Sequence, residues 1–308
     1  MNALQHICAF GIHLDVAKII YQYCEFAGVL RNKLGGHTNA VLSLAVFPNG
    51  DLCSASSDRT IKIWRDVKCI KKLIGHEHAL VNLAMSSDAN LYSLSFDGII
   101  KVWRDVTCMQ TLKSHGGWLY CLAFTSDDIL YSGSSDGTIK KWKRGEYGGN
   151  WASVQHLQGH TNEVLHLVVL QNGDLCSGSY GGEIKIWRND VCITTLVGHF
   201  VPITALVVLS NGNLCSGSYD KKIKIWQDEK CLFTFENEVV AYALVIMPNG
   251  DLCSGYSNGT IKVFRIESAS VKCMHIFKEH NSTITALRIL QDGCLCSGSR
   301  DGTIKIWE

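Results

Sequence analysis

The stretch that decides the fold is residues 36–65, which read GHTNAVLSLAVFPNGDLCSASSDRTIKIWR. Apolar and β-branched residues alternate here and just beyond, which predicts four short strands at 41–47, 52–56, 60–64 and 69–73. Asn49 and Gly50 mark a hairpin turn between the first two strands, because an Asn-Gly pair tolerates positive φ angles. Residues 57–59 form the next turn. We therefore expect one antiparallel sheet of four strands.

This unit recurs along the chain. A histidine marks one phase of the repeat, at His37, His76, His115, His160, His199 and His280, and we place Glu238 at the missing position. The spacings are 39, 39, 45, 39, 39 and 42 residues, with the extra residues in loop insertions at 143–156 and 267–271. One such sheet cannot bury both of its apolar faces alone. We expect seven sheets to pack radially around an axis, as an all-β propeller.

Two kinds of recurring residue carry a resemblance to a known family. Glycine precedes the histidine in pairs such as Gly36-His37 and Gly75-His76, and tryptophan ends a strand at Trp64, Trp103, Trp142, Trp187, Trp226 and Trp307. Residues 29–308 thereby closely resemble the WD40-repeat family. The resemblance implies a seven-bladed β-propeller. Since little follows Trp307, it also implies that the N-terminal segment 29–34 supplies the last blade's fourth strand.

The resemblance further implies a hydrogen-bonded structural tetrad of histidine, serine, aspartate and tryptophan in each blade. The complete sets are His37, Ser54, Asp58, Trp64; His76, Ser93, Asp97, Trp103; His115, Ser132, Asp136, Trp142; His199, Ser216, Asp220, Trp226; and His280, Ser297, Asp301, Trp307. Blade four has Gly181 in place of aspartate, and blade six is degenerate, with Glu238, Ser254, Asn258 and Phe264. We expect both blades to be locally weaker, because an unpaired buried polar group costs about 1–3 kcal/mol.

Serine, histidine and aspartate together suggest a hydrolase, but we interpret the tetrads as structural. An enzyme needs one active site, whereas this arrangement recurs in five blades, and a buried tryptophan N–H needs an acceptor that serine provides. No Cys-x-x-Cys pair, phosphate loop or His-Glu-x-x-His motif occurs in the sequence. We predict no catalytic residue, no metal site and no cofactor.

The fourteen cysteines recur mainly in two series. One series is Cys53, Cys176, Cys215, Cys253 and Cys296, and the other is Cys69, Cys108, Cys192, Cys231 and Cys273. We interpret both as small buried hydrophobes at equivalent strand positions. Reduced thiols of this kind indicate a cytoplasmic protein, with the nucleus as the alternative.

The charge balance argues against several classes of partner. The formal net charge is +1, which gives no electrostatic reason to expect nucleic acid or a membrane surface. A lysine precedes each strand-ending aromatic residue by two positions, at Lys62, Lys101, Lys140, Lys185, Lys224, Lys262 and Lys305. We interpret these lysines as stems packed along the blades, with ammonium groups in water, rather than as an anion groove. We expect no nucleic acid, no membrane span and, for the isolated chain, a monomer.

In the WD40 family a binding rim forms from the residue before the turn aspartate and the third and fifth residues after the histidine. Here these positions carry a sector of aromatic residues on blades two to five. The candidate partner-binding residues are Phe96, Trp118, Tyr120, Glu163, Tyr180, Tyr219 and Arg300. Aromatic residues and arginine are enriched at binding hot spots. The alternative is that the rings merely cover neighbouring loops.

Two further segments carry open interpretations. The insertion 143–156 contains Tyr147 and Trp151, which form either a second contact site or, for Trp151, packing against the body. Residues 3–24 have helical spacing, and their start weakly resembles an ankyrin repeat, although Ile12 replaces the usual glycine. We therefore divide the chain into a helical extension, 1–28, and the propeller, 29–308.

The function that follows is a non-catalytic scaffold that binds a peptide or protein on the propeller rim. The alternative is a substrate-recruiting or ubiquitin-binding component of the ubiquitin system, a role that many WD40 proteins have. No F-box precedes the repeats, and the Trp-Asp-x-Arg ending of one ligase class is replaced by Trp64-Arg65-Asp66.

Overall fold

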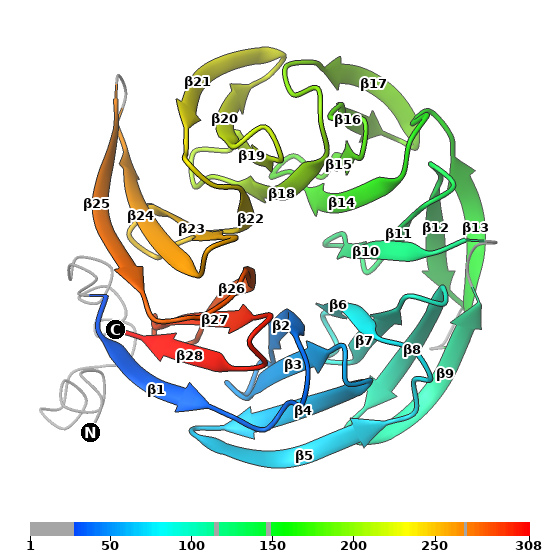
Figure 1. The fold of residues 1–308 in the computed structure, drawn as a ribbon. Helices are drawn as coiled ribbons and strands as arrows, with labels where there is room; N and C mark the ends of the chain where they lie inside the picture. The colour runs from blue at the N-terminus through cyan, green and yellow to red at the C-terminus, as the bar shows by residue number, and fades with distance from the viewer. Residues whose placement is uncertain (1–27, 114–116, 146–148, 268–269) are drawn as a thin grey trace, which may run out of the picture.

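The computed structural model describes residues 28–113, 117–145, 149–267 and 270–308. Seven antiparallel sheets of four strands each stand around a central opening (Figure 1), which confirms the seven-bladed propeller. The predicted helical segment 3–24 lies outside the described residues. Within the described ranges, no helix has the length and apolar character needed to cross a bilayer.

The strands occupy four positions from the axis outward. The innermost strands are β2 (Val41–Val46), β6 (Leu80–Met85), β10 (Leu119–Phe124), β14 (Val164–Val169), β18 (Ile203–Val208), β22 (Ala241–Ile246) and β26 (Ile284–Ile289). The second strands are β3 (Leu52–Ser56), β7 (Leu91–Ser95), β11 (Leu130–Ser134), β15 (Leu175–Ser179), β19 (Leu214–Ser218), β23 (Leu252–Tyr256) and β27 (Leu295–Ser299). The third strands are β4 (Thr60–Arg65), β8 (Ile99–Arg104), β12 (Ile139–Arg144), β16 (Ile184–Arg188), β20 (Lys222–Gln227), β24 (Thr260–Ile266) and β28 (Ile304–Trp307). The outermost strands are β5 (Lys68–Ile74), β9 (Thr107–Lys113), β13 (Trp151–Leu157), β17 (Val191–Leu196), β21 (Lys230–Glu236), β25 (Val271–Lys278) and, from the N-terminal side, β1 (Leu30–Leu34).

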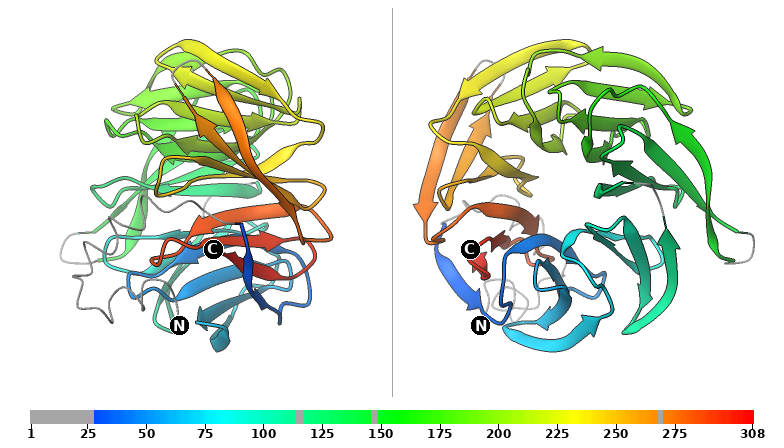
Figure 2. Two further views of the ribbon diagram at one scale, coloured as in Figure 1. Left: turned by 90° about the vertical axis from the view of Figure 1, so that its left-hand side faces the viewer. Right: turned by 45° about the vertical axis from the view of Figure 1, so that its right-hand side comes forward.

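Blades one to six are continuous in sequence, and blade seven joins the two ends of the chain. Its strand order is β1-β28-β27-β26, so the expected closing strand is present. The backbone N–H of Val29 donates to the carbonyl of Glu308 at 2.9 Å, and the N–H of Glu308 donates back at 3.0 Å. Arg31 on β1 forms an ion pair with Asp292 at 2.9 Å. Figure 2 shows β1 beside β28 from two further directions.

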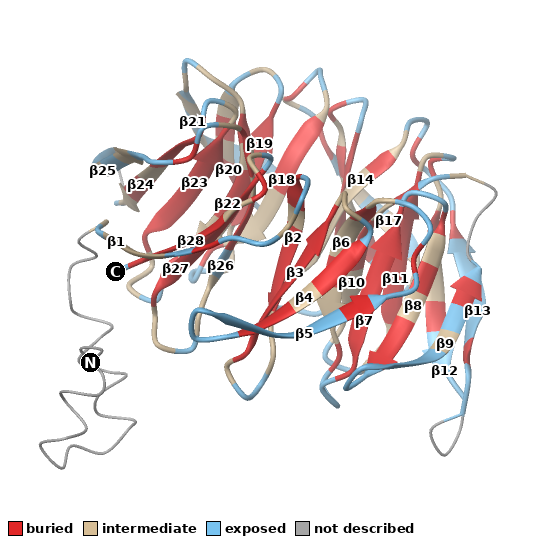
Figure 3. Ribbon diagram, turned by 60° about the horizontal axis from the view of Figure 1, so that its bottom comes forward, coloured by how far each residue is buried: buried red, intermediate tan, exposed pale blue. Residues whose placement is uncertain are grey.

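Burial follows the position of a strand in its blade. Every residue of the second strands, such as Leu52–Ser56 and Leu175–Ser179, is buried, because these strands lie between neighbours in their own blade and against adjacent blades. The outermost strands are largely exposed (Figure 3), as the pattern of Lys68–Ile74 illustrates. The core is therefore a series of packed interfaces between successive sheets rather than one central cluster.

The turns between the first two strands of a blade confirm the turn prediction. Glycine adopts a positive φ in each Asn-Gly turn, as at Gly50 (88°) and Gly212 (87°). A side chain is strained at such angles, which explains glycine at this position. The turn brings an aspartate such as Asp51 close to the arginine that follows the blade's tryptophan.

One expectation about the cysteines is wrong. The first series is buried, but in the second series Cys69, Cys108, Cys231 and Cys273 are exposed and Cys192 is half-buried. These residues lie on outermost strands, where each pairs in register with the strand-ending aromatic residue, as Cys69 does with Trp64. An outermost strand has one face toward solvent. The recurrence of a cysteine at one position of the repeat therefore does not tell whether its side chain is buried or exposed.

Candidate functional site: tetrads and propeller rim

The predicted tetrad has the expected geometry in blades one, five and seven. In blade one, Trp64 Nε1 donates to Ser54 Oγ at 2.8 Å, Ser54 Oγ lies 2.7 Å from His37 Nε2, and His37 Nδ1 lies 2.8 Å from Asp58 Oδ2. The corresponding atoms of blades five and seven lie within 2.7–2.9 Å of one another. In blade three, Trp142 donates to Ser132 at 2.9 Å, while His115 lies outside the described residues.

The directions of these bonds follow from the donors available. The indole N–H can only donate, so Ser54 accepts it and directs its own proton to His37 Nε2. His37 is then the tautomer that carries its proton on Nδ1 and donates it to Asp58. The tetrad serines of all seven blades are fully buried, as Ser54 is. These hydroxyls have no solvent access and are engaged in the buried networks, which fits the structural interpretation of the tetrads.

Blade two departs from the predicted pattern. His76 Nδ1 lies 3.0 Å from Ser95 Oγ rather than against Asp97. Ser95 in turn donates a short hydrogen bond to Asp97, so the carboxylate reaches the histidine only through the serine. Burial lowers the pKa of His76 to about 4.

Blade four has an acidic partner for its histidine that was not predicted. His160 Nδ1 lies 2.8 Å from Glu183 Oε1, and His160 Nε2 lies 2.6 Å from Ser177. Glu183 stands two positions after Gly181, and its longer side chain reaches the site that aspartate occupies elsewhere. Blade four therefore has an acidic partner for its histidine, contrary to the expectation.

We expect Glu183→Ala to lower the free energy of unfolding by about 1–3 kcal/mol, because it leaves the buried Nδ1–H of His160 without its acceptor. The measurement is chemical denaturation at pH 7. Glu77→Ala is the matched control, since Glu77 is an exposed glutamate beside the histidine of blade two. Equal stabilities of the two variants would show that Glu183 contributes nothing to blade four.

Blade six has a different buried network. Ser254 Oγ donates to Tyr256 Oη at 3.0 Å, and Tyr256 donates to Asn237 Oδ1 at 2.7 Å, with Tyr256 itself fully buried. Strand β22 begins at Ala241, four residues after Asn237, just as β2 begins four residues after His37. Asn237, and not Glu238, therefore occupies the histidine phase. The adjacent spacings are 38 residues, from 199 to 237, and 43 residues, from 237 to 280.

The recurring lysines lie along the blades, but several of their ammonium groups bond within the chain instead of pointing into water, and Lys305 is buried. Lys101, Lys185 and Lys224 donate to threonine hydroxyls of the outermost strand at 3.1, 3.0 and 2.9 Å. Lys62 donates to the carbonyl of Gly36 at 2.5 Å. Their ammonium groups are thus engaged within the blades rather than gathered in one groove.

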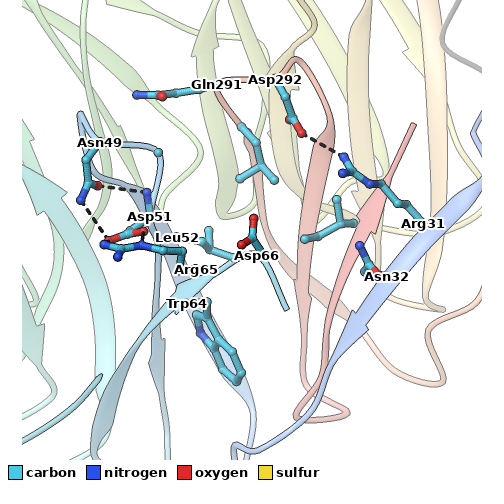
Figure 4. A pocket seen from close by; sticks show the side chains of 13 residues that line it. Arg31, Asn32, Asn49, Asp51, Leu52, Trp64, Arg65, Asp66, Gln291 and Asp292 are labelled. Carbon is cyan, nitrogen blue, oxygen red and sulfur yellow. Dashed lines mark hydrogen bonds and ion pairs between the residues drawn. The ribbon is translucent and has the colours of Figure 1, made fainter. Parts of the chain in front are cut away.

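Hollows at the ends of the strands that carry the Asn-Gly turns contain recurring arginine–aspartate ion pairs, and Asp66 also lines one of these hollows. Figure 4 shows one of about 370 Å³ between blades seven and one, where Arg65 clasps Asp51 through two bonds of 2.8 Å and Arg31 reaches Asp292 at 2.9 Å. A similar hollow of about 470 Å³ between blades four and five contains the Arg188–Asp174 pair. These repeated pairs hold the turns, which makes the hollows weaker candidates for a ligand site.

The two series of predicted rim positions lie side by side at the other end of the strands. In all seven blades the backbone N–H of the residue before the turn aspartate, or its counterpart, donates to the carbonyl of the third residue after the histidine phase. The pairs are Ser57–Ala40, Phe96–Ala79, Ser135–Trp118, Tyr180–Glu163, Tyr219–Pro202, Ser257–Val240 and Arg300–Thr283, at 2.8–3.0 Å. The fold therefore presents both series as one continuous rim around the axis.

Aromatic rings from adjacent blades contact one another on this rim. The ring of Phe96 lies 6.4 Å from that of Trp118 and 6.5 Å from that of Tyr120, both edge to face. Burial raises the pKa of Tyr120 to about 12, and the negative charge of the nearby Glu163 carboxylate adds to the effect. Trp118 is 60% exposed and Tyr180 is 53% exposed. Structural packing alone does not require such large exposed rings.

A second group completes the rim on blades five to seven. Tyr242 donates to the Tyr219 hydroxyl at 2.5 Å, and the Arg300 guanidinium lies 5.9 Å from the centre of the Tyr242 ring. Tyr242 was not predicted as a rim residue, because the repeat phase of blade six was placed at Glu238. Counted from Asn237, Tyr242 is the fifth residue and belongs to the same series as Tyr120.

The structure resolves the interpretation of Trp151. Trp151 is buried and lies 5.6 Å from the ring of Tyr92 and 6.0 Å from that of Phe124, so it packs against the body of the propeller. Tyr147 lies outside the described residues.

Comparisons with known proteins agree with this architecture. A family model described as "WD domain, G-beta repeat" matches residues 28–65, 67–104, 190–227 and 271–308, and one described as "IP5P C-F beta-propeller" matches residues 115–197. The matches begin at residue 28, so they do not support the ankyrin resemblance of the preceding segment. The WD40 beta propeller domain of Doa1 is similar in structure, with a TM-score of 0.80 and 26% sequence identity, over 92% of this chain and 97% of that one. No curated protein matches the chain.

Proposed function

Because this chain is a WD40-repeat β-propeller, a fold that generally serves as a protein-interaction scaffold, we propose that it is a non-catalytic scaffold that binds a peptide or protein partner on its rim. The observation that carries the proposal is the aromatic sector of the rim. Trp118, Tyr180 and Tyr219 are 60%, 53% and 48% exposed there, on three consecutive blades. Rings of this size that remain open to solvent are typical of interaction surfaces.

The rim also has the rigidity that binding favours. The backbone of Trp118 is held from both sides, since its N–H donates to Ser135 Oγ at 3.0 Å and its carbonyl accepts from Ser134 Oγ at 3.2 Å. Tyr219 is held by the hydroxyl of Tyr242. A rim whose backbone and side chains are held by such bonds loses little conformational entropy when a partner covers it.

The test is affinity capture from a cytosolic extract with the variant Trp118→Ala, Tyr180→Ala, Tyr219→Ala. We expect partners of the wild-type protein to be retained at least about tenfold less by this variant, because hot-spot truncations cost about 2 kcal/mol or more. The control variant carries Ile74→Ala, Val191→Ala and Ile276→Ala, which remove exposed apolar side chains from outermost strands. Equal retention by wild type and rim variant, with both folded by circular dichroism, would refute the proposal.

Ubiquitin is a direct probe for the alternative function. Purified ubiquitin added to the wild-type protein and to the rim variant separates the two roles. Binding that the rim variant loses would favour a component of the ubiquitin system. If the wild-type protein binds other partners through the rim but does not bind ubiquitin, the result favours a scaffold outside that system.

A further inference from the structure

Five rim residues on blades two to four form a cluster with a distinct composition. We call Phe96, Trp118, Tyr120, Glu163 and Tyr180 the acid–aromatic cluster. The ring contacts of Phe96 join blade two to blade three, and the Tyr120 hydroxyl of blade three is close enough to the Glu163 carboxylate of blade four for that charge to raise the pKa of Tyr120. Tyr180 is tied to Glu163 through its backbone N–H at 2.8 Å.

The carboxylate of Glu163 is the feature that the rest of the rim does not repeat. The equivalent third positions of the other blades are uncharged: Ala40, Ala79, Trp118, Pro202, Val240 and Thr283. Among the residues that the structure describes, no lysine, arginine or histidine forms an ion pair with Glu163, whereas Asp58 of the first tetrad and Asp51 of the first turn have such partners. A half-buried carboxylate without a described cationic partner, on a rim that carries exposed aromatic rings, attracts a positive charge from outside.

On blades six and seven, a cation of the chain itself already lies against an aromatic ring of the rim. The Arg300 guanidinium lies 5.9 Å from the centre of the Tyr242 ring, so one tyrosine face is occupied by a cation of the protein itself. No described cation is within such a distance of the rings of Trp118 or Tyr180. The two most exposed rings of the cluster therefore have no described cation against them, and they share the rim with an acid that has no described cationic partner.

Resting on the proposed rim function, we propose that the acid–aromatic cluster binds a cationic side chain, arginine or lysine, of the partner. The cation would lie against the exposed rings of Trp118 and Tyr180 with its charge toward Glu163. Aromatic faces attract ammonium and guanidinium groups through their quadrupole, and the planar guanidinium also stacks on them and bonds the carboxylate.

The test uses three acetylated, amidated tripeptides, Gly-Arg-Gly, Gly-Lys-Gly and Gly-citrulline-Gly, titrated into the full chain. The readout is the indole N–H resonance of Trp118, assigned with Trp118→Phe. We expect saturable millimolar binding of at least one cationic peptide and at least about tenfold weaker binding of the neutral citrulline peptide. The ratio between the arginine and lysine peptides tells which cation is preferred.

Glu163→Gln should weaken the cationic peptide at least about fivefold, while Glu77→Gln, which removes an exposed glutamate at the same end of the strands, should leave it unchanged. Equal binding of the arginine and citrulline peptides, or an unchanged affinity in Glu163→Gln, would overturn the cation inference. The scaffold proposal is separable from it. Extract partners that are kept by Glu163→Gln but lost by the triple rim variant would leave the scaffold standing and reject the cation.

Discussion

Replacing Trp307 with alanine is expected to lower the free energy of unfolding by about 3–5 kcal/mol, the range for a large aromatic side chain removed from a packed core. Trp307 is 1% exposed and lies on β28, between β27 and the closing strand β1. Its ring packs 4.6 Å from that of Phe277, and its N–H donates to Ser297 at 2.9 Å. The substitution removes these contacts where the ring of blades is closed, so neither neighbouring strand can compensate by moving inward.

Two further variants separate packing from hydrogen bonding. Trp307→Phe keeps most of the ring and loses the N–H donor, so we expect a smaller loss of about 1–2 kcal/mol. Blade six already has Phe264 at this position and compensates with the bond from Ser254 to Tyr256. Phe200→Ala removes an aromatic ring that is 80% exposed and should change stability by less than about 0.5 kcal/mol. Chemical denaturation measures all three, and a Trp307→Ala value close to that of Phe200→Ala would contradict the role of Trp307 in closure.

The repeat made most of the fold predictable. The four strands expected in the first unit differ from the observed ones by no more than one residue at either end, because alternation and turn residues act locally and seven copies reinforce the same phase. The closing strand was predictable for a similar reason. Blade seven lacked a fourth strand, and only the N-terminal segment 29–34 had the right phase to supply it.

Three features of the structure differ from the predictions, and their physical causes cannot be read from one sequence. Glu183 replaces the missing aspartate of blade four from two positions further along, because its side chain is longer by one methylene. Blade six lost its histidine, so the phase was placed at Glu238 instead of Asn237, and Tyr242 was overlooked. The cysteines of the outermost strands share a repeat position with one another, but burial depends on whether another sheet covers them.

For the rim, the positions of the residues were predictable, but their contacts were not. Their positions followed from the resemblance, and the structure shows that Phe96 contacts both Trp118 and Tyr120. That Glu163 has no cationic partner among the described residues could not be read from the sequence, because it depends on which side chains three adjacent blades bring together. The same seven-bladed frame therefore carries both buried hydrogen-bond networks, which recur with variations, and a rim whose residues differ from blade to blade.

Lowering the pH from 7 to 5 is expected to destabilise the propeller, because its buried histidines must remain neutral. Burial lowers the pKa of His76 to about 4, and burial also lowers the pKa of His37, His160, His199 and His280 against the opposing effect of their acidic partners. In the unfolded chain a histidine titrates near pH 6.5. The unfolded state thus binds protons more readily, and acidification favours it.

The size of the effect follows from the interval between the two pKa values. For His76, which is 7% exposed, the interval from about 6.5 to about 4 corresponds to about 3 kcal/mol of stability that is fully present above pH 6.5 and lost as the pH falls toward 4. About 2 kcal/mol of this is lost by pH 5. Asp58 and Asp301 affect the stability only at a lower pH than the histidines do. Burial would raise their pKa values, but hydrogen bonds from Thr60 and Thr303 and from the tetrad histidines hold them at about 2, so they stay ionised throughout this range.

Chemical denaturation at pH 7 and pH 5 measures the effect, and the variant His76→Gln isolates one histidine. The loss of stability between the two pH values should be about 2 kcal/mol smaller in His76→Gln than in wild type, although the variant is less stable at pH 7, because glutamine has no proton to gain. His156→Gln removes a histidine from an exposed position on β13 and should leave the wild-type pH dependence unchanged. If both variants lose as much stability as wild type, proton uptake by the His76 tetrad does not control acid unfolding. A reduced loss in His76→Gln alone would instead identify His76, and not the exposed His156, as a group that makes the propeller sensitive to acid.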